Sequence, residues 1–244
     1  MKYEQPRNID ITTLTTISGA LSTVVDEMSN VVLRTARSPV FKLAKDFSCS
    51  LCDWQGRQLV QGDAELPVQV GSIPLVCRAV AATYEGRVFP GDVFLCNDPA
   101  FGGTHLNDTA LLQPVFCENE LSFWAIVRAH WLDIRGVSPS DLRNAQSDIY
   151  GEGVRIAPIK IIERGEHRSD IMRLLFDNFR FPKQQLRRRP IEKQLPQTKF
   201  VPDHLADQWQ RRACPLHIHD GTLLVSGQPK PQAQSFTRLT RWAL

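Results

Sequence analysis

Membrane and export signals are missing from the sequence. No apolar run approaches the ~18 residues of a membrane-spanning helix, and residues 1–6 lack the apolar core of a signal peptide. The six cysteines (49, 52, 77, 96, 117 and 214) are irregularly spaced, which fits a reducing compartment where each serves as a small apolar residue. We therefore expect a cytoplasmic protein with no membrane partner.

Three motifs of nucleotide and acyl chemistry are also missing. There is no Gly-x-x-x-x-Gly-Lys-Ser/Thr loop and no strand-borne Gly-x-Gly-x-x-Gly, so the chain shows no phosphate cradle of its own. It has no Gly-x-Ser-x-Gly elbow, the turn that exposes a serine nucleophile. The composition is otherwise globular, with 244 residues, 42% hydrophobic and 23% charged, enough for one large domain or two small ones.

Apolar spacing predicts both helices and strands. An amphipathic helix, with Asp10, Thr12 and Thr13 as candidate N-caps, has apolar residues every three or four positions from Leu14 to Val31. Further elements follow: strands at 46–53 and 58–60, a helix capped by Ser72 and running to about Tyr84, a strand at 93–96, a polar loop at 138–147, and a short helix from Ser169 to Asn178.

A doubled His-x-x-Asp dominates the middle of the chain, as His105 to Asp108 and again as His130 to Asp133. The segment between them reads as a β-hairpin that folds about Asn119, which puts residues whose numbers sum to 238 opposite one another. His105 then faces Asp133, and Asp108 faces His130. Opposed residues in an antiparallel pair lie roughly 4.5 to 5.5 Å apart, so each histidine is expected to meet a carboxylate.

These four residues predict a metal site. Imidazole nitrogen and carboxylate oxygen suit divalent Zn, Mn or Fe, and the absence of cysteine from the cluster favours an open catalytic site. Because residues three apart on a regular strand point to opposite faces, an irregular loop is needed, and Gly102 with Gly103 can supply it. Asp98, just before Pro99, is a candidate fifth ligand or a partner of a ligand. The alternative is a pair of solvated loop motifs.

Two other features invite functional readings. Cys49 and Cys52 form a Cys-x-x-Cys, but on a strand they point to opposite faces, so we interpret them as structural rather than as zinc or redox ligands. Glu152 and Arg155 lie in a glycine-containing segment, where they could contact substrate or a metal-bound water, or form an internal ion pair.

Several motifs in one order resemble the hydantoinase B/oxoprolinase family. The resemblance covers about residues 8–182 and rests on the segments 46–49, 91–94, 97–99, 102–108, 128–134, 152–156 and 178–180. The family contains the B subunit of N-methylhydantoinase, the B half of 5-oxoprolinase and the alpha-type subunits of acetone carboxylase. It implies an α+β fold with a mixed, largely antiparallel sheet and packed helices, as the N-terminal part of a larger family fold.

The resemblance also implies a function. Family members work in hetero-oligomers with an A-type subunit that binds ATP, while the B-type subunit carries a divalent metal. The matching positions for that metal here are Asp98, His105, Asp108, His130 and Asp133. The implied chemistry is hydrolysis of an activated lactam or hydantoin, or carboxylation of a ketone.

The sequence departs from the family pattern in places, which keeps a second reading open. Gln69, Arg135 and Ala157 stand where the family commonly has His, Gly and Pro, and the Arg135 side chain is able to pair with Asp133 and compete with the metal. A non-catalytic remnant or assembly module of such a complex is therefore the alternative. Nucleic acid is not the expected partner, because the basic runs 187–189 and 211–212 lack interleaved aromatics and a binding motif.

Composition changes where the resemblance ends, so we divide the chain into a truncated family domain at 1–182 and a basic, poorly ordered tail at 183–244. Residues 182–244 carry 11 Lys and Arg against 4 Asp and Glu, whereas residues 1–181 carry 18 against 22. The tail also holds six of the 16 prolines and shows no sustained helix or strand period. A frameshift would produce such a change, and a basic linker that docks an acidic partner is the alternative.

Limited proteolysis tests the predicted boundary. Cleavage should begin between Gln184 and Lys199 and leave an intact core, because a segment without packed apolar residues offers its backbone to the protease. Mass spectrometry of the fragments locates the cuts. A protease-resistant tail with protected amides would show that the tail folds.

Overall fold

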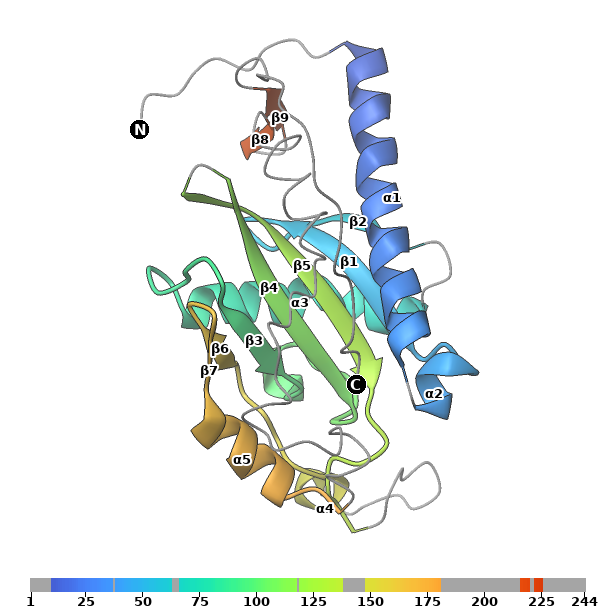
Figure 1. Ribbon diagram of the computed structural model, residues 1–244, viewed down its shortest axis with the longest axis vertical. Coiled ribbons are helices and arrows are strands. Elements are labelled where there is room, and N and C mark those ends of the chain that lie inside the picture. The colour runs from blue at the N-terminus through green and yellow to red at the C-terminus, as the bar shows by residue number, and fades with distance from the viewer. Residues whose placement is uncertain are drawn as a thin grey trace.

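A seven-stranded sheet forms the centre of the molecule in the computed structural model, which describes residues 10–36, 38–62, 66–117, 119–137, 148–180, 216–219 and 222–225 (Figure 1). The strand order is β2-β1-β5-β4-β3-β6-β7, and every pairing in it is antiparallel. The strands are β1 Phe47–Asp53, β2 Gln58–Gln61, β3 Val93–Cys96, β4 Asp108–Cys117, β5 Glu120–His130, β6 Ile159–Glu163 and β7 Glu166–His167. The predicted α+β class is confirmed, without the parallel strands that a mixed sheet would add in this part of the chain.

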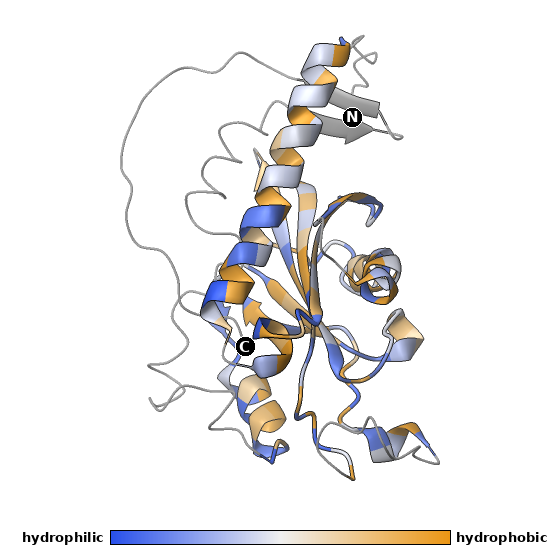
Figure 2. Cartoon of the chain, turned by 90° about the vertical axis from the view of Figure 1, so that its right-hand side faces the viewer, coloured by the Kyte–Doolittle hydropathy of each residue, from blue (hydrophilic) through white to orange (hydrophobic). Residues whose placement is uncertain are grey.

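Helices cover both faces of the sheet. Helix α1 (Ile11–Thr35) lies on one face, and α3 (Pro67–Thr83) lies on the other, as the edge-on view of the sheet shows (Figure 2). The remaining helices are α2 Pro39–Lys42, α4 Ile149–Glu152, α5 Ser169–Asp177 and the 3-10 turn η1 Pro99–Phe101. A separate two-stranded ribbon, β8 Leu216–His219 with β9 Thr222–Val225, completes the described elements. None of these helices combines the length and the hydropathy of a membrane span.

Helix α1 follows its sequence signals. The Asp10 side chain accepts a hydrogen bond from the Thr13 N–H at 2.9 Å, which caps the helix as predicted. The helix ends at Thr35, and Ser38, which precedes Pro39, is extended because proline disfavours the helical conformation in the residue before it. Its buried residues, Leu21, Val24, Val25, Met28 and Val32, belong to the larger of two core clusters.

Helix α3 begins earlier than predicted. Its first residue is Pro67, whose missing N–H and fixed φ suit the first turn. Ser72 therefore lies inside the helix, where its hydroxyl donates to the Gln69 carbonyl at 2.8 Å instead of capping. Ile73, Val76 and Val80 belong to the second core cluster, which lies on the opposite face of the sheet from α1.

Strand β1 contributes residues to both core clusters, one on each face of the sheet. Cys49 belongs to the cluster on the α1 face and Cys52 to the cluster on the α3 face, and both are fully buried thiols that form no disulfide. The structural reading of this Cys-x-x-Cys is therefore confirmed. Cys77 and Cys96 are also buried and form no disulfide, whereas Cys117 is disulfide-bonded, so the expectation of small apolar thiols holds for four of these five.

The hairpin of β4 and β5 has the predicted register along most of its length. Asn119 adopts a left-handed φ of 69° at the turn, and the pairs from Asp108 with His130 to Val115 with Phe123 sum to 238. A bulge between Val115 and Phe116 shifts only the last two pairs. The expected pair of His105 with Asp133 is not part of the ladder, which begins with Asp108 and His130. Both residues lie beyond the strand ends, where the chain turns.

Two glycine substitutions with opposite expected signs test this packing. A Cβ at Gly103 would overlap the Asn97 carbonyl oxygen and lie 2.8 Å from the Asp98 carbonyl carbon, both backbone atoms that cannot rotate away. Gly103→Ala should lower the free energy of unfolding by about 1–3 kcal/mol. Gly19→Ala, in α1 with nothing near its added Cβ, should raise it by roughly 0.5–1 kcal/mol. Urea unfolding of both variants measures the two changes in the free energy of unfolding. Equal changes would show that the loop around Gly103 accommodates a Cβ.

Candidate metal centre

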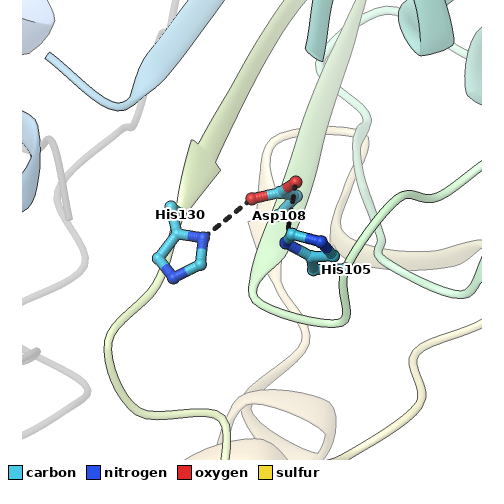
Figure 3. A group of neighbouring side chains, drawn as sticks. All are labelled: His105, Asp108 and His130. Carbon is cyan, nitrogen blue, oxygen red and sulfur yellow. Dashed lines mark hydrogen bonds and ion pairs between the residues drawn. The ribbon is translucent and has the colours of Figure 1, made fainter. Parts of the chain in front are cut away.

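His105, Asp108 and His130 meet at one end of the β4–β5 hairpin (Figure 3). Asp108 is the first residue of β4, His130 is the last of β5, and the two are paired directly across the ladder. His105 comes from the loop between η1 and β4. One ligand atom from each of the three residues lies within 4.8 Å of the other two. Three of the four motif residues thus gather at one point, whereas Asp133 is not part of the group.

Asp108 is the centre of the group. Its Oδ1 lies 2.9 Å from His130 Nδ1, its Oδ2 lies 3.9 Å from His105 Nδ1, and the Thr104 hydroxyl donates to that same Oδ2. The side chains of Asp108 and His130 are 4% and 11% exposed, whereas that of His105 is 71% exposed. The group is therefore buried on the hairpin side and accessible on the His105 side.

The structure adds Asp46, which the sequence did not nominate. Its backbone carbonyl accepts from the His130 N–H at 3.1 Å, its Oδ2 lies 4.0 Å from His130 Nδ1, and its Oδ1 accepts from Gln69 Nε2 at 2.6 Å. The one signal in the sequence was its place at the head of the segment 46–49 that carried the family resemblance. Gln69 in turn connects the first turn of α3 to the site.

Electrostatics at this end of the sheet favour a bound positive charge. Burial lowers the pKa of His130, but the hydrogen bond to Asp108 and the charges of Asp108 and Asp46 outweigh it, so the pKa stands above the usual histidine value. Burial raises the pKa of Asp108, but its hydrogen bonds with His130 and Thr104 bring it below the usual carboxyl value. Burial raises the pKa of Asp46, and the charge of Asp108 raises it further. These carboxylates thus hold a proton on His130 or attract a cation in its place.

A buried arginine forms hydrogen bonds with the segments that surround the group. Arg128 is fully buried, and its guanidinium donates to the Asp108 carbonyl at 3.2 Å, to the Gly102 carbonyl at 3.4 Å and to the Ser72 hydroxyl. Burial lowers its pKa, and the charge of Asp108 opposes that effect. One side chain therefore joins α3, the loop after η1 and the start of β4.

The other two predicted ligands lie outside the three-residue group. Asp98 caps η1 through the Ala100 N–H and forms an ion pair with Arg155 at 2.9 Å; the internal ion pair expected for Arg155 exists, with Asp98 rather than Glu152. Asp133 is buried and accepts from the Arg135 N–H at 3.1 Å. The Arg135 guanidinium is directed to Asn178 Oδ1, at 2.9 Å.

The donors fit a divalent transition ion. Two imidazoles and one carboxylate, with a second carboxylate beside them, are the ligand types that Zn, Mn and Fe accept in proteins. Two ligands on opposite sides of one ion lie ~4 Å apart at metal–ligand distances of about 2.0–2.2 Å, and ligands in a tetrahedral site lie closer together. The three side chains, which now spread over up to 4.8 Å, would therefore move towards one another to hold one ion.

Comparison with known proteins identifies relatives of this chain. The hydantoinase B/oxoprolinase family model matches residues 10–187. The beta subunit of caprolactamase from Pseudomonas jessenii is 37% identical over 172 residues, covering 70% of this chain and 29% of that subunit. The crystal structure of the ATP-dependent caprolactamase superposes with a TM-score of 0.66 over 71% of this chain and 30% of the matched chain.

Two further proteins extend the comparison. The 5-oxoprolinase of Saccharomyces cerevisiae is 33% identical over 170 residues, which cover 69% of this chain and 13% of the yeast protein. A nucleotide-free structure of acetone carboxylase shares the fold, with a TM-score of 0.62 at 20% identity over 82% of this chain and 24% of that one. The chain thus spans less than a third of the length of each of these relatives.

Proposed function

The chain belongs to the hydantoinase B/oxoprolinase family, and we propose that it is the metal-binding part of an ATP-dependent enzyme that opens cyclic amides. The observation that carries the proposal is the His105–Asp108–His130 group, accessible from the His105 side. Two relatives support the substrate class, because caprolactam and 5-oxoproline, for which they are named, are both lactams. A hydantoin, for which another relative is named, is a second cyclic substrate of this kind. A ketone, as in the name of acetone carboxylase, is the alternative substrate.

The proposed ligands are His105, Asp108 and His130, with Asp46 beside them as a fourth donor and the second carboxylate. Asp98 and Asp133 are proposed to hold the surrounding loops, since each already accepts a backbone N–H there. A divalent Zn, Mn or Fe ion in this position would act as a Lewis acid on a carbonyl oxygen. Asp108 orients His130 through their 2.9 Å hydrogen bond, and the exposed His105 lines the side from which a substrate would approach.

ATP is proposed to bind to another subunit. The chain has no phosphate-binding loop, and the caprolactamase relative is named as one subunit of an ATP-dependent enzyme. An A-type ATP-binding subunit is therefore the proposed partner. The assembly-module reading differs in one respect only: the complex would form without turnover.

Cation binding tests the site directly. After removal of metal with a chelator, calorimetric titration with Mn²⁺ or Zn²⁺ should reveal one site, and saturation should raise the melting temperature by mass action. His105→Ala and His130→Ala should weaken binding at least about tenfold, because each removes one ligand. His167→Ala, in β7 at the edge of the sheet, is the matched control and should bind as the unchanged chain does. Unaltered affinity in His130→Ala would refute the assignment.

ATP turnover tests the partner. The purified chain alone should hydrolyse no ATP, whereas a mixture with an A-type subunit should hydrolyse ATP only when a cyclic amide and a divalent ion are present. Phosphate release and ring opening, followed in one assay, measure the coupling. A metal-dependent ATPase activity of the homogeneous chain, lost in His130→Ala, would overturn the need for a partner. A stable complex without turnover would favour the assembly module.

A further inference from the structure

The three residues of the metal centre are held in place by different means. Asp108 and His130 are fixed by the sheet, because they are directly paired residues of β4 and β5. His105 has no strand of its own: it lies in a turn between η1 and β4, and most of its side chain is exposed. The geometry of the group therefore depends on what holds this loop.

Asn97 is one of the residues that hold it, beside Arg128, which donates to the Gly102 carbonyl, and Asp108, whose N–H donates to the His105 carbonyl at 3.0 Å. Asn97 follows β3 directly and is 0% exposed. Its Nδ2 donates to the Leu106 carbonyl at 2.7 Å and to the Val154 carbonyl at 3.0 Å, and its Oδ1 accepts from the Ile156 N–H at 2.7 Å. Both N–H bonds of the amide and its oxygen are thus engaged, which leaves the side chain a single orientation.

The main chain of Asn97 also contacts the loop. Its backbone carbonyl oxygen lies so close to Gly103 that a Cβ at that position would overlap it. Leu106, the residue after His105, is fully buried in the core cluster of the α1 face. The loop is consequently pinned at Gly103 and at Leu106, on either side of His105, and Asn97 is common to both contacts.

We propose that Asn97 is a positioning residue of the metal centre, which sets His105 by clamping the Leu106 carbonyl to the segment 154–156. The inference rests on the proposed metal-binding function. The position of His105, the third ligand, then depends on a segment about 50 residues further along the chain. The ion pair between Asp98 and Arg155 connects that segment to the residue after Asn97.

Asn97→Asp gives the sharpest test. The variant is isosteric, but it turns the donor that faces two carbonyls into an acceptor, so the clamp is lost. Its added negative charge would by itself strengthen cation binding, so a weaker affinity in the folded variant indicates a displaced ligand. We expect at least about tenfold weaker Co²⁺ binding, and a visible absorption spectrum of bound Co²⁺ that shifts towards that of His105→Ala.

Asn178→Asp is the matched control. It makes the same chemical change at the end of α5, where the side chain contacts Leu174 and Arg135 instead of the loop, and it should leave the Co²⁺ spectrum unchanged. Asn97→Ala buries no charge and repeats the test if the aspartate variant does not fold. It should shift the spectrum in the same direction.

Hydrogen exchange separates this inference from the proposed function. In the metal-free protein, amide exchange in residues 98–107 should rise in the Asn97 variants, while the β4–β5 hairpin keeps its protection. Absence of Co²⁺ binding by the unchanged chain would refute the metal site but leave the clamp to be decided by exchange. An unchanged Co²⁺ spectrum, or exchange that rises equally in the hairpin, would overturn the positioning role.

Discussion

The candidate site depends on the register of one antiparallel hairpin. Asp108 and His130 are opposed only because β4 and β5 pair as they do, and a slip of one residue would turn one of the two side chains to the other face of the sheet. The bulge between Val115 and Phe116 disturbs the ladder, but it lies near the Asn119 turn, so the register at the other end is unaffected. Beyond that end, Asn107 continues the connection through its hydrogen bonds with the backbone of Trp131.

A second constraint is electrostatic. The α3 face of the sheet is apolar around Trp124 and Ile126, but polar and charged towards the end of β5, where Arg128 and His130 follow on the same face. Buried charges are costly unless they are paired or hydrogen-bonded. Here the groups satisfy one another: Arg128 donates to the Asp108 carbonyl, Asp108 binds His130, and Gln69 binds Asp46. An arrangement with two carboxylates this close is suited to a cation, which would be the strongest local charge.

The relatives place this site in context. The matched part of the chain contains all three residues of the group, so cation binding can be examined on this chain alone. Caprolactamase and 5-oxoprolinase activity, and ATP dependence, are named for proteins of which the chain spans less than a third. The same antiparallel sheet, shared with acetone carboxylase at 20% identity, shows that this fold accommodates considerable sequence change.

Local signals in the sequence determined the helices α1 and α5, the strands β1 to β5, and the register that opposes Asp108 and His130, because caps, alternation and hairpin symmetry act between near neighbours in the chain. Only the tertiary structure decided the rest. The roles of Asp98 and Asp46 are set by Arg155, Gln69 and His130, which are far away in sequence. The early start of α3 likewise lets Gln69 reach Asp46 and Ser72 reach Arg128. Such contacts follow from how layers pack, and no spacing within one segment encodes which distant side chain a buried carboxylate will meet.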